Sequence, residues 1–94
     1  MTTESKKNMK LFGYFQRFTG GQEWVTVQGG TVGECVADLV RQFPAARKKL
    51  YDDKGKLYGH VAIFLNGRLL TASDLATPVK ETDSLSMMPQ LGGG

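Results

Sequence analysis

Short stretches of alternating or densely apolar residues run through the chain, and they predict β-strands. In the stretch EWVTV, residues 23–27, Trp24 and Thr26 fall on one face while the two valines fall on the other. This period of two is typical of a half-buried strand. The remaining stretches are rich in β-branched, aromatic or long aliphatic residues and predict four more strands: Met9–Phe18, His60–Leu65, Arg68–Leu70 and Ser84–Met88.

The longest segment with helical periodicity begins at Thr31. Thr31 and Glu34 have the spacing of a capping box, in which each side chain satisfies a backbone N–H of the first helical turn. An apolar stripe with the spacing of one helix face follows at Val36, Leu39, Val40 and Phe43. Because Pro44 disfavours helical geometry in the residue before it, we expect the helix to end at Phe43.

Turn signals separate these elements. Thr19–Gln22 contains paired glycines, which tolerate positive φ, and Asn66-Gly67 is a strong signal for a two-residue hairpin. Residues 45–58 are predicted to form a charged connection, and Lys80–Asp83 a polar turn. The predicted order is therefore strand, strand, helix, strand, short strand, strand.

This order predicts an α+β protein with a β-grasp fold. One amphipathic helix needs a sheet to bury its stripe, and we expect a mixed four- to five-stranded sheet packed on one main helix, with the first and last strands adjacent in the middle. The domain is expected to span residues 9–89. A disordered, polar leader is expected at residues 1–8 and a flexible tail at residues 90–94.

Composition narrows the class of protein. The 94 residues carry a net charge of +3, which is too small to indicate nucleic-acid binding. The single cysteine, Cys35, cannot form an internal disulfide, which fits a reduced compartment. No apolar segment reaches the length that crosses a membrane. We therefore expect a cytoplasmic protein with neither a membrane nor a nucleic acid as partner.

Residues with catalytic potential are sparse, so we expect no enzyme. His60 is the one histidine and is interpreted as a strand-edge residue, while Cys35 is interpreted as a small buried thiol. No metal-ligand spacing or phosphate-binding loop is present, and no cofactor is expected on this chain. A basic cluster is interpreted as a solvated face, with docking onto an acidic enzyme as the alternative; its members are Arg41, Arg47, Lys48, Lys49, Lys54 and Lys56.

The sequence ends in Gly92-Gly93-Gly94. Glycine loses the most entropy on ordering, so three terminal glycines contribute nothing to a fold. Without side chains, they form a thin strip that can enter a channel where any Cβ would clash. A carboxylate at the end of this strip can attack the α-phosphate of ATP and become an acyl-adenylate, which sulfide, a persulfide or an amine can displace. The alternative interpretation is a linker with no role.

Several segments resemble the ubiquitin-like β-grasp sulfur carriers. This family includes the small subunit of molybdopterin synthase, the thiamine-pathway carrier and the carrier of a cysteine-synthesis branch. The resemblance extends from about Met9 to Gly94 and is carried by Arg17–Gln22, Gly30–Gly33, Asp38-Leu39, Gly55–Leu57, Val61–Asn66, Leu75–Thr77, Asp83–Leu85 and Pro89 with the glycines. Thr19–Gln22 and Gly55–Leu57 are most similar to the cysteine-synthesis carrier.

The resemblance implies three partners. A ubiquitin-activating-type adenylyltransferase would activate the tail with ATP, a pyridoxal-phosphate-dependent cysteine synthase would accept the sulfur, and a deubiquitinase-like zinc metallopeptidase would cleave the adduct. It also implies that Gly94, or Gly93 after trimming, bears the adenylate and the thiocarboxylate. Gly92 and Leu91 would be recognised by the partner. The family usually ends in two glycines after a small residue, whereas Leu91 here precedes three.

Apolar strand residues that one helix leaves uncovered are candidates for the partner-docking surface: Phe12, Tyr14, Phe64 and Met88. Each has a place in the core as its alternative. Alternatives also stay open for the function. The same tail suits a ubiquitin-like modifier joined to lysines, a permanent small subunit of molybdopterin synthase, or an interaction domain whose tail is idle.

Overall fold

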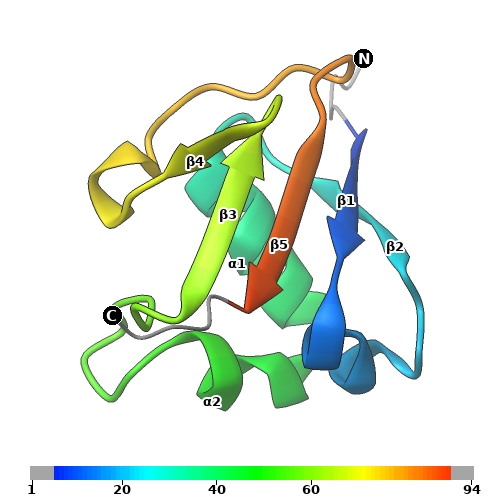
Figure 1. The fold of residues 1–94 in the computed structure, drawn as a ribbon, viewed down its shortest axis with the longest axis vertical. Helices are drawn as coiled ribbons and strands as arrows, with labels where there is room; N and C mark the ends of the chain where they lie inside the picture. The colour runs from blue at the N-terminus through cyan, green and yellow to red at the C-terminus, as the bar shows by residue number, and fades with distance from the viewer. Residues whose placement is uncertain (1–5, 90–94) are drawn as a thin grey trace.

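The structure is a computed structural model that describes residues 6–89. Within this range, five strands form one sheet in the order β2-β1-β5-β3-β4 (Figure 1). The central strands β1 and β5 are parallel, and every other neighbouring pair is antiparallel. The strands are β1 (Lys6–Leu11), β2 (Trp24–Gln28), β3 (Val61–Leu65), β4 (Arg68–Leu70) and β5 (Leu85–Pro89). The predicted mixed sheet, with the first and last strands adjacent in its middle, is confirmed.

Helix α1 (Val32–Gln42) covers one face of this sheet, as Figure 1 shows. Its start is capped as predicted: Thr31 Oγ1 accepts the Glu34 N–H at 3.2 Å. The Glu34 carboxylate reaches one residue further back than a capping box requires and accepts the Gly30 N–H at 2.7 Å. The helix ends at Gln42, with Phe43 as its C-cap before Pro44, which confirms the predicted stop.

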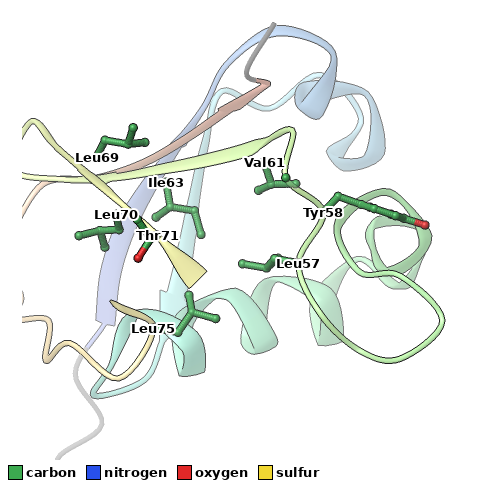
Figure 2. A pocket seen from close by; sticks show the side chains of 9 residues that line it. Leu57, Tyr58, Val61, Ile63, Leu69, Leu70, Thr71 and Leu75 are labelled. Carbon is green, nitrogen blue, oxygen red and sulfur yellow. The ribbon is translucent and has the colours of Figure 1, made fainter. Parts of the chain in front are cut away.

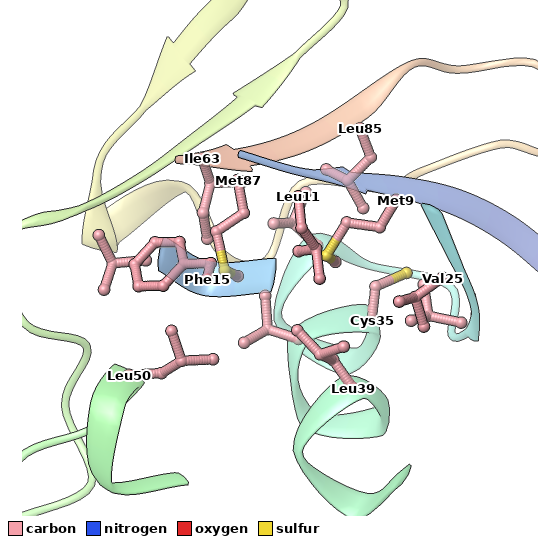
Figure 3. Packing of buried hydrophobic residues seen from close by; sticks show 14 of the residues in the cluster. Met9, Leu11, Phe15, Val25, Cys35, Leu39, Leu50, Ile63, Leu85 and Met87 are labelled. Atoms are coloured by element: carbon pink, nitrogen blue, oxygen red, sulfur yellow. The ribbon is translucent and has the colours of Figure 1, made fainter. Parts of the chain in front are cut away.

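The core lies between α1 and the sheet (Figure 3). Cys35, Val36 and Leu39 of the helix are fully or almost fully buried. They form one cluster with the inward side chains of the central strands: Met9, Leu11, Ile63, Leu85 and Met87. Burying each large aliphatic side chain contributes about 1.5–3 kcal/mol. The strands that meet in the middle of the sheet therefore also contribute much of the core.

The first predicted strand, Met9–Phe18, is too long. β1 ends at Leu11, and residues Gly13–Thr19 form a 3-10 helix, hereafter the η1 turn. Gly13 has a φ of +64°, which redirects the chain, and the Gln16 side chain donates to the Leu11 carbonyl at 2.9 Å. Phe15 is fully buried in the cluster. The aromatic residues that suggested a strand therefore belong to a turn that is anchored in the core.

β1 also begins earlier than predicted. The sequence predicts a polar leader over residues 1–8, but Lys6 pairs with Gln28 and Lys7 with Val27. Lys7 is almost fully buried, and its ammonium donates to the Gly29 carbonyl. A lysine gives no apolar signal, so the strand start was hidden in the sequence. Residues 1–5 of the predicted leader and the predicted tail, 90–94, lie outside the described residues.

The connections agree with the prediction at one turn and differ at another. Asn66 and Gly67 have φ values of +54° and +83°, the geometry expected of the two-residue hairpin that joins β3 to β4. In the predicted charged connection, however, Pro44–Ala46 forms a 3-10 turn and Arg47–Leu50 a short helix, α2. Leu50 is fully buried, which explains why this polar segment folds against the core.

The Asp38 carboxylate connects α1 to β2 by hydrogen bonds. Its side chain is 7% exposed, and its Oδ2 accepts the Gln28 N–H at 3.0 Å and the Gln42 amide at 2.8 Å. Arg41 forms an ion pair with the other oxygen. Burial raises the pKa of the Asp38 carboxyl, but the hydrogen bonds from Gln28, Gln42 and Arg41 outweigh burial and hold the pKa below its ordinary value.

Asp38→Asn is expected to lower the free energy of unfolding by about 1–3 kcal/mol at pH 7, because an amide nitrogen replaces one acceptor oxygen. The folded-state pKa is lowered, so this stability is present above the ordinary pKa of about 3.9 and is lost as pH falls through the folded value. Urea unfolding at several pH values measures the difference, which should shrink below about pH 4. Asp53→Asn, at an exposed loop carboxylate, is the control. A difference that stays constant down to pH 2 would contradict this role.

Candidate functional site

β5 carries the chain to the point where the glycine tail begins. Its last residue, Pro89, pairs with Val61 of β3. On the other side of β5, the Phe12 N–H donates to the Met87 carbonyl at 3.0 Å. Gly13 lies so close that a Cβ built on it would be 2.8 Å from Pro89 Cγ. The end of β5 is therefore held from both sides. Leu91, Gly92, Gly93 and Gly94 lie outside the described residues.

The face of the sheet opposite α1 carries a row of side chains across all five strands. The strand register aligns one residue from each strand, in the order Trp24, Lys10, Ser86, Phe64 and Leu69. Trp24 is 54% exposed and Leu69 48% exposed, while Phe64 is half-buried. We call this row the open-face row. Its apolar members lie toward both edges of the sheet, with Lys10 and Ser86 between them.

Lys10 links the aromatic residues on this face. Its Nζ lies 4.9 Å from the centroid of the Phe12 ring and 5.6 Å from that of the Trp24 ring, which is cation–π geometry. The same ammonium lies 3.5 Å from the Glu23 carboxylate. These contacts stabilise the two rings beside the end of β1 and leave much of Trp24 accessible to solvent.

The predicted docking residues separate into two groups. Phe64 is part of the open-face row, Met88 lies two residues beyond Ser86 on the same face of β5, and Phe12 contacts Lys10. All three are half-buried. Tyr14 belongs instead to the η1 turn, beyond the sheet. The prediction left out Trp24 and Leu69. The alternation in EWVTV already placed Trp24 opposite the buried valines, so this signal was available.

His60 and Cys35 lie in different surroundings. His60 is exposed and stacks on Tyr58, with ring centroids 5.2 Å apart, whereas Cys35 is fully buried beside the Gly29 carbonyl. Burial raises the pKa of the Cys35 thiol, which disfavours the nucleophilic thiolate. Across residues 6–89, no group of three or more His, Cys, Asp or Glu side chains is placed to hold a metal ion.

An apolar pocket of about 260 Å³ lies beside β4 (Figure 2). Leu57, Leu70 and Leu75 converge on it from three segments, and Ile63 and Val61 of β3 complete its wall. Thr71 and Tyr58 supply its polar side chains. The residues that line it include no Asp, Glu, His, Cys, Lys or Arg. Among the helices of the described range, none has both the length and the apolar character needed to cross a membrane.

Comparison with known proteins agrees with this geometry. A model of the ThiS family matches residues 9–94. The sulfur carrier protein CysO of Mycobacterium tuberculosis is 34% identical over 79 residues, covering 81% of this chain and 85% of CysO. Small archaeal modifier protein 1 of Haloferax volcanii is 32% identical over 87 residues, covering 90% of this chain and 97% of that protein.

The fold comparison points the same way. The crystal structure of SAMP1 from Haloferax volcanii superposes with a TM-score of 0.82 at 28% identity, covering 96% of this chain and all of that one. The named relatives are carrier or modifier proteins rather than catalysts. The family match includes both the β-grasp domain and the terminal glycines, so this chain belongs to the ThiS family of ubiquitin-like β-grasp sulfur carriers.

Proposed function

We propose that this protein carries sulfur as a thiocarboxylate on its C-terminal glycine. The observation that supports this most strongly is the place of Gly92–Gly94 in the chain. The glycines fall inside the ThiS family match and follow shortly after β5, the strand held between β1 and β3. A rigid domain can then present a strip without side chains to the active site of another protein. The chemistry takes place on the backbone carboxylate, so this chain needs no catalytic side chain.

The proposed reaction has two steps. First, a terminal carboxylate oxygen attacks the α-phosphorus of ATP; the bond to the pyrophosphate leaving group breaks, and an acyl-adenylate forms. Second, hydrosulfide attacks the acyl carbon, the bond to the AMP oxygen breaks, and AMP leaves with that electron pair. The product is a terminal thiocarboxylate. ATP and the activating residues belong to a ubiquitin-activating-type adenylyltransferase. Gly94 bears the sulfur, or Gly93 if one residue is trimmed first.

The open-face row is the proposed docking surface for that enzyme. Trp24 and Leu69 are large, apolar and about half exposed, and Phe64 lies between them and is half-buried. Apolar aromatic and aliphatic side chains of this kind are enriched at the centres of protein interfaces. The row crosses β5, the strand whose last residue is Pro89. A partner that covers this face is therefore also close to the start of the tail.

The proposed sulfur acceptor is a biosynthetic enzyme, with a pyridoxal-phosphate-dependent cysteine synthase as the first candidate. The support is the 34% identity to a sulfur carrier named CysO. In this scheme the thiocarboxylate sulfur replaces the leaving group on the β-carbon of an activated serine, and the bond from that carbon to the leaving group breaks. A zinc metallopeptidase then hydrolyses the bond between the carrier's terminal acyl group and the amino acid, which regenerates the carrier carboxylate. Pyridoxal phosphate and zinc are held by the partners.

A second candidate is a ubiquitin-like modifier, favoured by the 32% identity to small archaeal modifier protein 1 over 90% of this chain. The first step is the same adenylation, but a lysine amine then displaces AMP and forms an isopeptide bond. The products separate the two functions. A carrier accumulates as one thiocarboxylated species, whereas a modifier gives conjugates of higher mass on an immunoblot, and these contain the tail joined to lysine.

The intact mass of the protein, purified from its host without hydrolysis, tests the carrier function directly. We expect a species in which one oxygen is replaced by sulfur, located by fragmentation on the last glycine. The same spectrum shows whether Gly94 is retained. If only the unmodified mass is found, even after incubation with ATP, sulfide and the host's activating enzyme, the carrier function is rejected.

Gly93→Trp is expected to abolish ATP-dependent release of pyrophosphate by the activating enzyme, because an indole does not fit a channel shaped for glycine. The urea unfolding midpoint should not change, because residue 93 follows Pro89, the last residue of β5, in the chain. Gly30→Ala is the matched control: its Cβ would have only one neighbour, the Glu34 carboxylate at 3.5 Å. Full activity of Gly93→Trp would contradict the role of the tail.

Trp24→Ser and Leu69→Ser should each raise the KM of the activating enzyme for this protein by about tenfold, the typical effect of removing an interface anchor. The kcat should stay unchanged, since these contacts act equally before and during reaction. Tyr58→Ser, at a 37%-exposed aromatic in the loop before β3, is the control. Wild-type KM values for both variants would show that the partner docks elsewhere.

A further inference from the structure

A second pocket, of about 370 Å³, opens at the end of the molecule where β5 finishes. The η1 turn supplies one wall and the segment around α2 the other; the lining residues are Tyr14, Arg17, Phe18, Ala45 and Lys49. Figure 1 shows both segments at the end of the sheet toward which the β5 arrow points. We call this cavity the basic pocket.

The walls of the basic pocket are fixed by the core. Phe15 is fully buried, and its ring lies 5.0 Å edge-on from Tyr14 and 5.9 Å from Phe18. On the opposite wall, Ala46 directly before α2 and Leu50 at the end of α2 are fully buried. The cavity therefore exists before any ligand binds, which lowers the entropic cost of binding.

The charge on this pocket is positive and is not balanced locally. Arg17 and Lys49 are exposed, and neither forms an ion pair with any residue of the described range. Residues 13–22 and 43–51, which include both walls, contain no Asp or Glu. The acids that flank these segments are engaged elsewhere: Glu23 lies 3.5 Å from Lys10, and Asp52 accepts the Lys54 and Lys56 N–H groups.

The pocket joins this charge to an aromatic surface. Tyr14 is 42% exposed and Phe18 half-buried, so both can contact an apolar side chain. Arg17 and Lys49 can at the same time donate hydrogen bonds to carboxylates at the rim. Arg and Tyr are among the residues that contribute most to binding at interfaces. The volume suits one or two side chains. A nucleic acid is a less suitable ligand for the pocket. Single-stranded DNA or RNA needs several exposed aromatic rings on which its bases stack, and the net charge of the protein is only +3.

The position of the pocket relates it to the tail. Gly13, the first residue of the η1 turn, lies against Pro89, and Tyr14 follows directly in the sequence. A protein that binds the chain directly after Pro89 must therefore lie close to the wall that the η1 turn forms. The open-face row includes Ser86 of β5, three residues before Pro89, so one partner at the end of β5 can contact both the row and the basic pocket.

We propose that the basic pocket binds an acidic segment of the partner protein that takes the tail, with an apolar side chain against Tyr14 and Phe18 and flanking carboxylates on Arg17 and Lys49. The identity of that partner rests on the proposed function. The binding itself rests on the charge and shape of the pocket. Positive charge beside the exit would steer the acidic surface toward the tail and lower the dissociation constant, more strongly at low salt.

Titration of the full, ¹⁵N-labelled chain with the peptide Ac-Glu-Glu-Leu-Glu-Glu-NH₂ tests the pocket without any enzyme. We expect saturable amide shifts in the η1 turn and α2, and none with the peptide in which glutamine replaces every glutamate. Arg17→Glu combined with Lys49→Glu should weaken binding at least tenfold. Lys54→Glu combined with Lys56→Glu makes the same change in net charge in another loop and should leave binding within twofold. Unchanged urea midpoints would show that both variants fold.

Three results would overturn the proposal: no shift at millimolar peptide, equal weakening by both double variants, or shifts produced by oligothymidylate and not by the peptide. The activation assay provides a second measurement. Arg17→Glu with Lys49→Glu should raise KM and leave kcat unchanged, unlike the tail variant. If the wild-type protein is not adenylated at all, the proposed function fails, and the peptide titration still decides whether the pocket binds an acidic segment.

Discussion

The parallel pairing of β1 with β5 is the contact on which the rest of the structure depends. Met9 pairs with Leu85 and Leu11 with Met87, and these four side chains form the centre of the core above α1. The pairing places the last strand between β1 and β3 rather than at an edge. The strand that precedes the tail is thereby hydrogen-bonded on both sides, although the three terminal glycines have no side chains.

This arrangement separates the two tasks of a carrier. One face of the sheet is buried under α1 and provides stability, and Cys35 of α1 and Lys7 of β1 are both buried. The other face keeps Trp24 and Leu69 exposed, and the end of the sheet carries the basic pocket. The exposed side chains of this face and the basic pocket are thus separate from the buried residues that maintain the fold.

The sequence predicted correctly those features that depend on interactions between neighbouring residues. The Thr31 cap, the stop before Pro44 and the Asn66-Gly67 hairpin depend on neighbouring residues, and all three were predicted. The η1 turn and the start of β1 were not. Phe15 and Lys7 are buried by distant segments, so an aromatic run was mistaken for a strand and a charged residue for a leader.

The sequence alone determined the glycine tail, the amphipathic helix and the alternation of the strands, because each follows from residue type and spacing. Only the tertiary structure decided which surfaces meet. Trp24, Phe64 and Leu69 come into one row through strand register. Arg17 and Lys49 line one pocket because η1 contacts the Pro44–Ala46 turn that leads into α2. Such contacts join residues far apart in the chain, and local propensity carries no information about them.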